Sequence, residues 1–75
     1  MVHFVLTVVG APTRAADIIK GLESAMGVGW ERQQGGVKYG RLFDVSPAEA
    51  HDRVMESLQA VDPSWREFLR PSPRP

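Results

Sequence analysis

The chain has 75 residues and no cysteine, and nine basic and nine acidic side chains cancel to a net charge of zero. This length allows one small domain, near the lower limit for a core that is stable without cross-links or bound metal. The lack of cysteine excludes disulfides and thiolate metal ligands. Balanced charge without a long run of one sign argues against nucleic acid or an anionic membrane as the main partner. No apolar run approaches the roughly 20 residues that cross a bilayer, and the opening VHFVLTVV lacks a charged leader. We therefore expect a cytoplasmic protein.

The first predicted element is a strand from Val2 to Val9, because VHFVLTVV is rich in β-branched residues and ends at Gly10. Side chains alternate along a strand, so Phe4, Leu6 and Val8 would share one face. The opposite face would carry His3, Val5, Thr7 and Val9. Neither row is properly polar, which predicts that both faces of the sheet are covered and that a partner covers the second.

A helix is predicted next, up to Gly27. Its apolar residues recur at helical spacing, and polar residues occupy the other side. Thr13 is the expected N-cap with Pro12 just before it, and Gly27 suits the left-handed residue that ends many helices.

The centre of the chain, VGWERQQGGVKYGRLFDV, predicts a tight β-hairpin around Gly35-Gly36. With these glycines as the turn, Arg32 lies opposite Tyr39 and Trp30 lies opposite Arg41. One face of the hairpin is then expected to be covered, and it consists of Val28, Trp30, Tyr39, Phe43 and Val45.

The second predicted helix begins at Ser46-Pro47-Ala48-Glu49, which has the pattern of a capping box with proline at the first helical position. Asp62-Pro63 is expected to end it, because a residue before proline is steered away from helical geometry.

The following SWREFLR has two interpretations: a helical turn capped by Asp62, or a fourth strand. Either way its large apolar residues predict docking onto the domain. We place the domain boundary at residue 70 and expect residues 71–75, PSPRP, to form a flexible proline-rich tail.

These elements predict an α+β fold, a split βαβ or ferredoxin-like βαββα(β) arrangement with an antiparallel sheet and two helices on one face. The element order resembles that of ACT domains, which are small regulatory modules that bind amino acids. VLTVVGAPTRAADII is similar to their opening over about a fifth of the chain. Pro12, Thr13 and Ala15 stand where that family has an acidic residue and a ligand-contacting glycine, so no ligand site is carried over.

The helix-free face of the predicted sheet supplies our leading hypothesis for function. It would expose Val5, Thr7, Val9 and Leu42, with a shallow spot at Gly40, and contiguous apolar surface on a small domain commonly marks a protein interface. We expect a non-enzymatic association module that acts as a homodimer or as an accessory subunit of another protein.

Candidate binding residues form a second group. Trp30, Arg32, Tyr39 and Arg41 lie near one another in the predicted hairpin, where they could form a contact patch for an anionic or aromatic ligand or a partner protein; the alternative is internal packing. His3 and His51, the only histidines, are the other two candidate binding residues, although no spacing makes them a metal pair.

No metal or cofactor is predicted, no residue is assigned a catalytic role, and the sequence leaves enzymatic activity open. The alternative function is a cofactor-free enzyme or a small-molecule-binding, ACT-like regulatory dimer with a pocket between sheet and helices. Nucleic-acid binding through Arg32, Lys38 and Arg41 ranks last.

Overall fold

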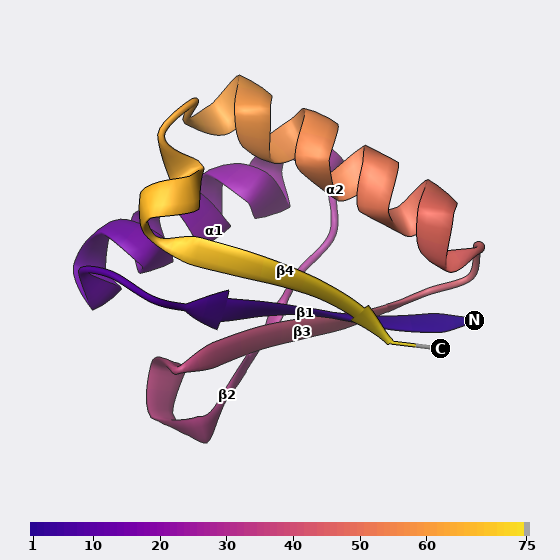
Figure 1. Ribbon diagram of the computed structural model, residues 1–75, viewed down its shortest axis with the longest axis horizontal. Helices are drawn as coiled ribbons and strands as arrows, with labels where there is room; N and C mark the ends of the chain where they lie inside the picture. Colours follow the sequence, from indigo (N-terminus) through magenta and orange to yellow (C-terminus); the bar gives the residue numbers. More distant parts are fainter. Residues whose placement is uncertain (75) are drawn as a thin grey trace.

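The computed structural model describes residues 1–74 and has two α-helices and one antiparallel sheet (Figure 1). The elements follow the predicted order: β1 (Val2–Val8), α1 (Pro12–Met26), β2 (Glu31–Gln33), β3 (Lys38–Phe43), α2 (Pro47–Val61) and β4 (Leu69–Arg74). The strand order across the sheet is β2-β3-β1-β4, so each helix connects two strands that are separated by a third. This is the ferredoxin-like arrangement, and the predicted fold class is confirmed.

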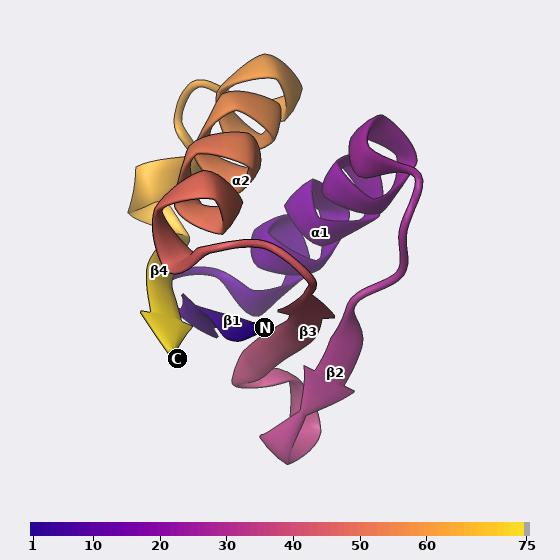
Figure 2. The ribbon, with the colours of Figure 1, turned by 90° about the vertical axis from the view of Figure 1, so that its right-hand side faces the viewer.

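Both helices cover the same face of the sheet, and the opposite face has no helix over it (Figure 2). Val2, Phe4 and Leu6 of β1 are fully buried beneath the helices, together with Leu22 of α1 and Leu58 of α2. The side of β1 that faces the core is therefore the one that the alternation predicted.

Aromatic rings form the part of this core below the start of α2. The rings of Phe4 and Trp30 meet edge to face at 6.1 Å, and Trp30 and Phe43 have their centroids 5.7 Å apart. Such edge-on contacts are favourable beyond the area they bury. Trp30 is therefore a packing residue, which is the second of the two interpretations given above.

The hairpin has the predicted register, with Arg32 paired to Tyr39 and Gln33 to Lys38. Gly35 (φ 67°) and Gly36 (φ 95°) both have positive φ, and the Val37 N–H donates to the Gln34 carbonyl at 3.4 Å, as in a primed two-residue turn. The first strand is shorter than predicted. It begins at Glu31 because the Trp30 N–H donates to the Glu23 carboxylate of α1 at 2.7 Å instead of to β3.

The helix ends agree with the sequence in part. Ser46 caps α2, because its Oγ accepts the Glu49 N–H at 3.2 Å. The Glu49 carboxylate, however, accepts from Arg53, so only one half of the capping box is present. Helix α1 begins at Pro12, one residue before the predicted cap Thr13, with Ala11 as its N-cap. Gly27 ends α1 in the left-handed conformation, as predicted.

The end of the chain combines the two interpretations of SWREFLR and departs from the predicted tail. A single 3-10 turn at Trp65–Glu67 follows Asp62, whose carbonyl accepts the Trp65 N–H, and β4 then pairs with β1 from Leu69 to Arg74. Residues 71–74, predicted as a flexible tail, belong to this strand because Pro71 lies opposite Leu6 and Ser72 opposite Val5. Residue 75 lies outside the described residues.

Candidate functional site

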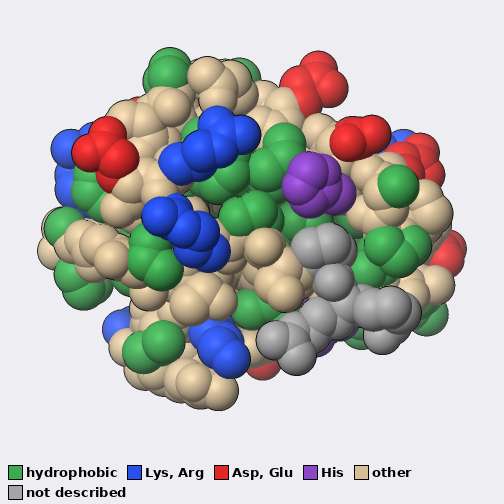
Figure 3. All heavy atoms as spheres, in the orientation of Figure 1, with side chains coloured by type: hydrophobic (Ala, Val, Ile, Leu, Met, Phe, Trp, Pro, Cys, Tyr) green, Lys and Arg blue, Asp and Glu red, His purple; other side chains and the backbone are tan. Residues whose placement is uncertain are grey.

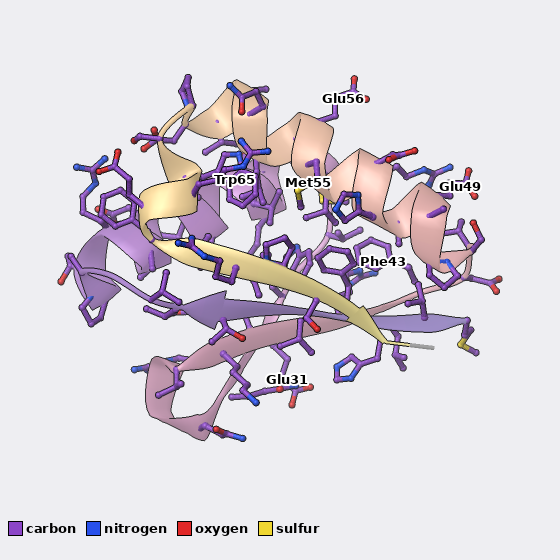
Figure 4. The ribbon with its side chains drawn as sticks, in the orientation of Figure 1. Glu31, Phe43, Glu49, Met55, Glu56 and Trp65 are labelled. Atoms are coloured by element: carbon purple, nitrogen blue, oxygen red, sulfur yellow. The ribbon has the colours of Figure 1, made fainter. Side chains whose placement is uncertain are left out.

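The helix-free face is defined by the register of the sheet, because residues paired across antiparallel strands point to the same side. His3 pairs with Leu42, Val5 with Gly40 and with Ser72. The same side also carries Thr7, Glu31, Gln33 and Lys38. Arg70 of the edge strand β4 pairs with Thr7, but its guanidinium turns back to the Arg66 and Leu69 carbonyls. In Figure 4, Glu31 extends away from the helices whereas Phe43 lies between sheet and helices.

This face is more polar than the sequence suggested, and its predicted interface residues differ in how far their side chains are exposed. Val5 is only 5% exposed, because it lies in an inner strand with the His3 side chain beside it, over Gly40. Thr7 is partly exposed. Leu42 is 61% exposed and Val9 is 49% exposed. The apolar surface of the face therefore comes from Leu42 and Val9, and Val5 adds almost nothing.

The large exposed apolar side chains of residues 1–74 all lie in the sheet or at its margin. Besides Leu42 and Val9 they are Met1, directly before β1, and Val37, at the hairpin turn. None of them belongs to α1 or α2. Because the large exposed apolar side chains all belong to the sheet or its margin, the sheet side is the surface best suited to a partner.

A shallow hollow of about 370 Å³ lies directly beside Leu42 on this face. His3, Glu31, Gly40 and Arg41 line it together with Leu42. Gly40 leaves room that His3 and Gln33 use, since a Cβ built on Gly40 would come within 2.8 Å of each of their side chains. The exposed leucine and the adjacent hollow thus form a projection and a depression side by side.

The predicted binding residues do not form one site. Trp30, Arg32 and Tyr39 line a groove of about 610 Å³ between α1 and the hairpin, to which α1 contributes Asp17, Lys20 and Glu23. The charges of this groove cancel, and two are already engaged: Glu23 accepts the Trp30 N–H, and Arg32 donates to the Gly35 carbonyl. Trp30 and Tyr39 are both buried.

The other three predicted residues are spread over both sides of the sheet. Arg41 donates to the Gly29 carbonyl at 2.9 Å and lies over the Phe43 ring, not over Trp30. His3 is on the helix-free face, whereas the His51 ring lies 6.4 Å from the Phe4 ring on the helix side. The sheet therefore separates the two histidines, and no group of three metal-ligating side chains gathers among the described residues.

A third groove, of about 440 Å³, lies between α2 and the edge strand β4, and the sequence analysis missed it. Its lining consists of His51, Met55, Trp65, Arg66, Leu69, Arg70 and Pro71. Figure 3 shows this face, where basic side chains lie on one side of an apolar patch and a histidine lies on the other. The signal was the alternation in LRPSPR, whose prolines recur at every second position as they can in an edge strand.

Asp62 is the one described group with a resolved electrostatic perturbation. Hydrogen bonds from the Ser64 side chain and backbone N–H, and then the Arg14 guanidinium, hold the pKa of its carboxyl below the ordinary value of 3.8. Asp62 ends α2 and joins it to α1 through Arg14 at 3.1 Å, so this perturbation belongs to the framework and not to a site.

Comparison of the chain with protein-family models, with curated proteins and with solved structures finds no match. The likeness to ACT domains therefore rests on element order and on the opening segment alone. Within residues 1–74, neither helix is long and apolar enough to cross a membrane.

Proposed function

We propose that this protein is a cytoplasmic, non-enzymatic association module that works as a homodimer, or as an accessory subunit of another protein, through the helix-free face of its sheet. The observation that supports this most is the pairing of exposed Leu42 with the hollow beside it. In a twofold dimer each patch meets its own copy, so a projection next to a depression is self-complementary. Leu42 of each copy would enter the hollow of the other, and a second copy is therefore the favoured partner.

Charge on this face also suits a second copy. Glu31 lies on the outer strand β2, while Lys38 lies at the start of β3, near the hairpin turn. A twofold axis near the middle of the face could bring Glu31 of one copy close to a cation of the other. Such rim pairs contribute mainly specificity and a faster encounter.

The edges of the sheet favour contact through the face rather than strand addition. Pro71 and Pro73 occupy alternate positions of the edge strand β4, and proline has no N–H to donate to a neighbouring strand. On the other edge, β2 is only three residues long. Edge pairing with another chain therefore has little backbone to use, whereas the face stays accessible.

The size of the face sets the expected strength. Three strands about 20 Å long and the shorter β2, all about 4.8 Å apart, present roughly 340 Å², less than half of what each partner gives to a standard interface. We therefore expect a weak dimer with a dissociation constant in the micromolar range or above. The cytoplasmic location is part of the proposal and is consistent with a chain that contains no cysteine.

Sedimentation equilibrium over micromolar to millimolar concentration tests the proposal. The wild type should approach the dimer mass at the upper end, and Leu42→Glu should remain monomeric because it places a carboxylate in the apolar contact. Gln59→Glu, on the exposed side of α2, adds the same charge and should dimerise normally. A wild type that stays monomeric throughout, or a Leu42→Glu that dimerises as well as Gln59→Glu, would refute the homodimer.

A further inference from the structure

The groove between α2 and β4 combines an apolar floor with an excess of positive charge. Trp65 and Leu69 are almost fully buried and line it together with the partly exposed Met55. Figure 4 shows Trp65 and Met55 in the space between α2 and β4. Arg66 and Arg70 are exposed on its border, and no acidic side chain is among the described residues that line it.

Both guanidinium groups are held beside the groove, and neither has an anionic partner among residues 1–74. Arg66 lies over the Trp65 ring, with its Cζ 4.4 Å from the centroid. Arg70 donates through Nη1 to the backbone carbonyls of Arg66 and Leu69. Within residues 1–74 no carboxylate lies in ion-pair range of Arg66 or Arg70, although Arg14 and Arg53 each have such a partner.

These features distinguish the groove from a solvated basic tail. A guanidinium stacked on tryptophan is restricted in its rotamers, and one anchored through Nη1 still has its Nε and Nη2 donors available for a flat anion. The volume of about 440 Å³ falls in the range of small-molecule sites, which combine apolar walls with a few polar groups.

We propose that this groove binds a small carboxylate with a flat apolar body, such as an aromatic acid. The apolar body would lie on the partly exposed Met55 and Pro71, above the buried Trp65 and Leu69, and the carboxylate would accept hydrogen bonds from Arg66 and Arg70. His51 closes the end of the groove near the start of α2. The buried floor of the site lies on the opposite side of the sheet from Leu42, so Leu42 takes no part in it.

Titration with naphthalene-2-carboxylate, followed by ¹⁵N–¹H NMR, tests the site. The two indole N–H signals belong to Trp30 and Trp65, and Trp30→Phe assigns them. The carboxylate should shift the Trp65 indole and the Leu69 and Arg70 amides in a saturable way. Its neutral amide, naphthalene-2-carboxamide, should bind about 10-fold more weakly, because the charge-assisted hydrogen bonds are lost.

Variants separate specific binding from general stickiness. Arg66→Gln and Arg70→Gln should each weaken binding of the carboxylate by about 10-fold and leave binding of the amide nearly unchanged. Arg53→Gln is the matched control, since Arg53 is an exposed arginine of α2 already paired with Glu49, and it should bind as the wild type does. The Leu42→Glu variant should also bind normally, which keeps this result separate from the dimer.

Several outcomes would overturn the site. Equal binding of the carboxylate and the amide would show that the arginines do not recognise the anion. Shifts that map to the groove between α1 and the hairpin, or to the helix-free face, would place the binding elsewhere. An absence of saturable shifts up to the solubility limit, or better binding of a purely acidic peptide without an apolar group, would remove the proposed ligand class.

Discussion

Replacing Gly10 with alanine tests how the end of β1 is fastened to the last part of the chain. A Cβ built on Gly10 would come within 2.5 Å of the Glu67 carbonyl oxygen and 3.1 Å of Phe68 Cδ1. Gly10 does not have a positive φ, so alanine can adopt its backbone conformation without strain at residue 10 itself. The substitution therefore probes close packing alone.

The neighbouring backbone has little freedom to move away. The Glu67 N–H donates to the Ser64 carbonyl at 3.0 Å, and the Phe68 carbonyl accepts the Val9 N–H at 2.9 Å. Overpacking of this kind costs about 1–3 kcal/mol, while alanine in place of glycine returns about 0.4–1 kcal/mol through the unfolded chain. We expect Gly10→Ala to lower the free energy of unfolding by about 1–2 kcal/mol, or Tm by roughly 5–15 °C.

Urea unfolding followed by tryptophan fluorescence measures this loss, because Trp30 and Trp65 are both buried and should report the transition. The midpoint should fall while the slope stays constant. Gly29→Ala is the matched control: its Cβ meets only Glu23 Oε2 at 3.8 Å, so stability should be unchanged or slightly higher. If Gly10→Ala proves as stable as Gly29→Ala, the close approach of β1 to the 3-10 turn is wrong.

Two further predictions concern the ends of α2. Ser46→Ala should cost about 1 kcal/mol, since it removes the acceptor of the Glu49 N–H, whereas Ser57→Ala within the helix should be neutral or slightly stabilising; urea unfolding compares them. Because the folded pKa of Asp62 lies below 3.8, its contribution is complete above that pH and is lost as pH falls through the folded pKa. The stability of Asp62→Asn should therefore fall less steeply than that of the wild type in acid, and parallel acid titrations of the two proteins would contradict the pairing of Asp62 with Ser64 and Arg14.

The sequence predicted turns and helix ends well where the local conformation requires one particular kind of residue. Gly35 and Gly36 both adopt the positive φ that a primed turn requires, and they set the register of Arg32 with Tyr39. Ser46 caps α2 for the same kind of reason, because a side-chain acceptor at that position satisfies a free N–H.

Tertiary contacts decided what the sequence could not. The Glu23 carboxylate of α1 takes the Trp30 N–H and thereby shortens β2, and no local pattern shows which helix will lie near residue 30. Val5 sits on the helix-free face but is covered by its neighbours in the sheet, so alternation gave its side and not its exposure.

The candidate sites show the same division. Trp30 and Arg41 were expected in one cluster, but Trp30 is buried in the core while Arg41 turns to Gly29 and Phe43. Nothing in the sequence distinguishes Arg66 and Arg70 from the charged residues of a solvated terminus. They border a groove because β4 pairs with β1 and brings Trp65 and Leu69 under α2.

The central claim is that the helix-free face pairs with a second copy, and an NMR dilution series of the ¹⁵N-labelled wild type tests it most directly. The amide chemical shifts of His3, Gly40 and Leu42 should depend on concentration, whereas those on the outer surfaces of α1 and α2 should not. This concentration dependence should be absent in Leu42→Glu. Spectra that do not change up to millimolar concentration, or changes confined to the helices, would contradict the account.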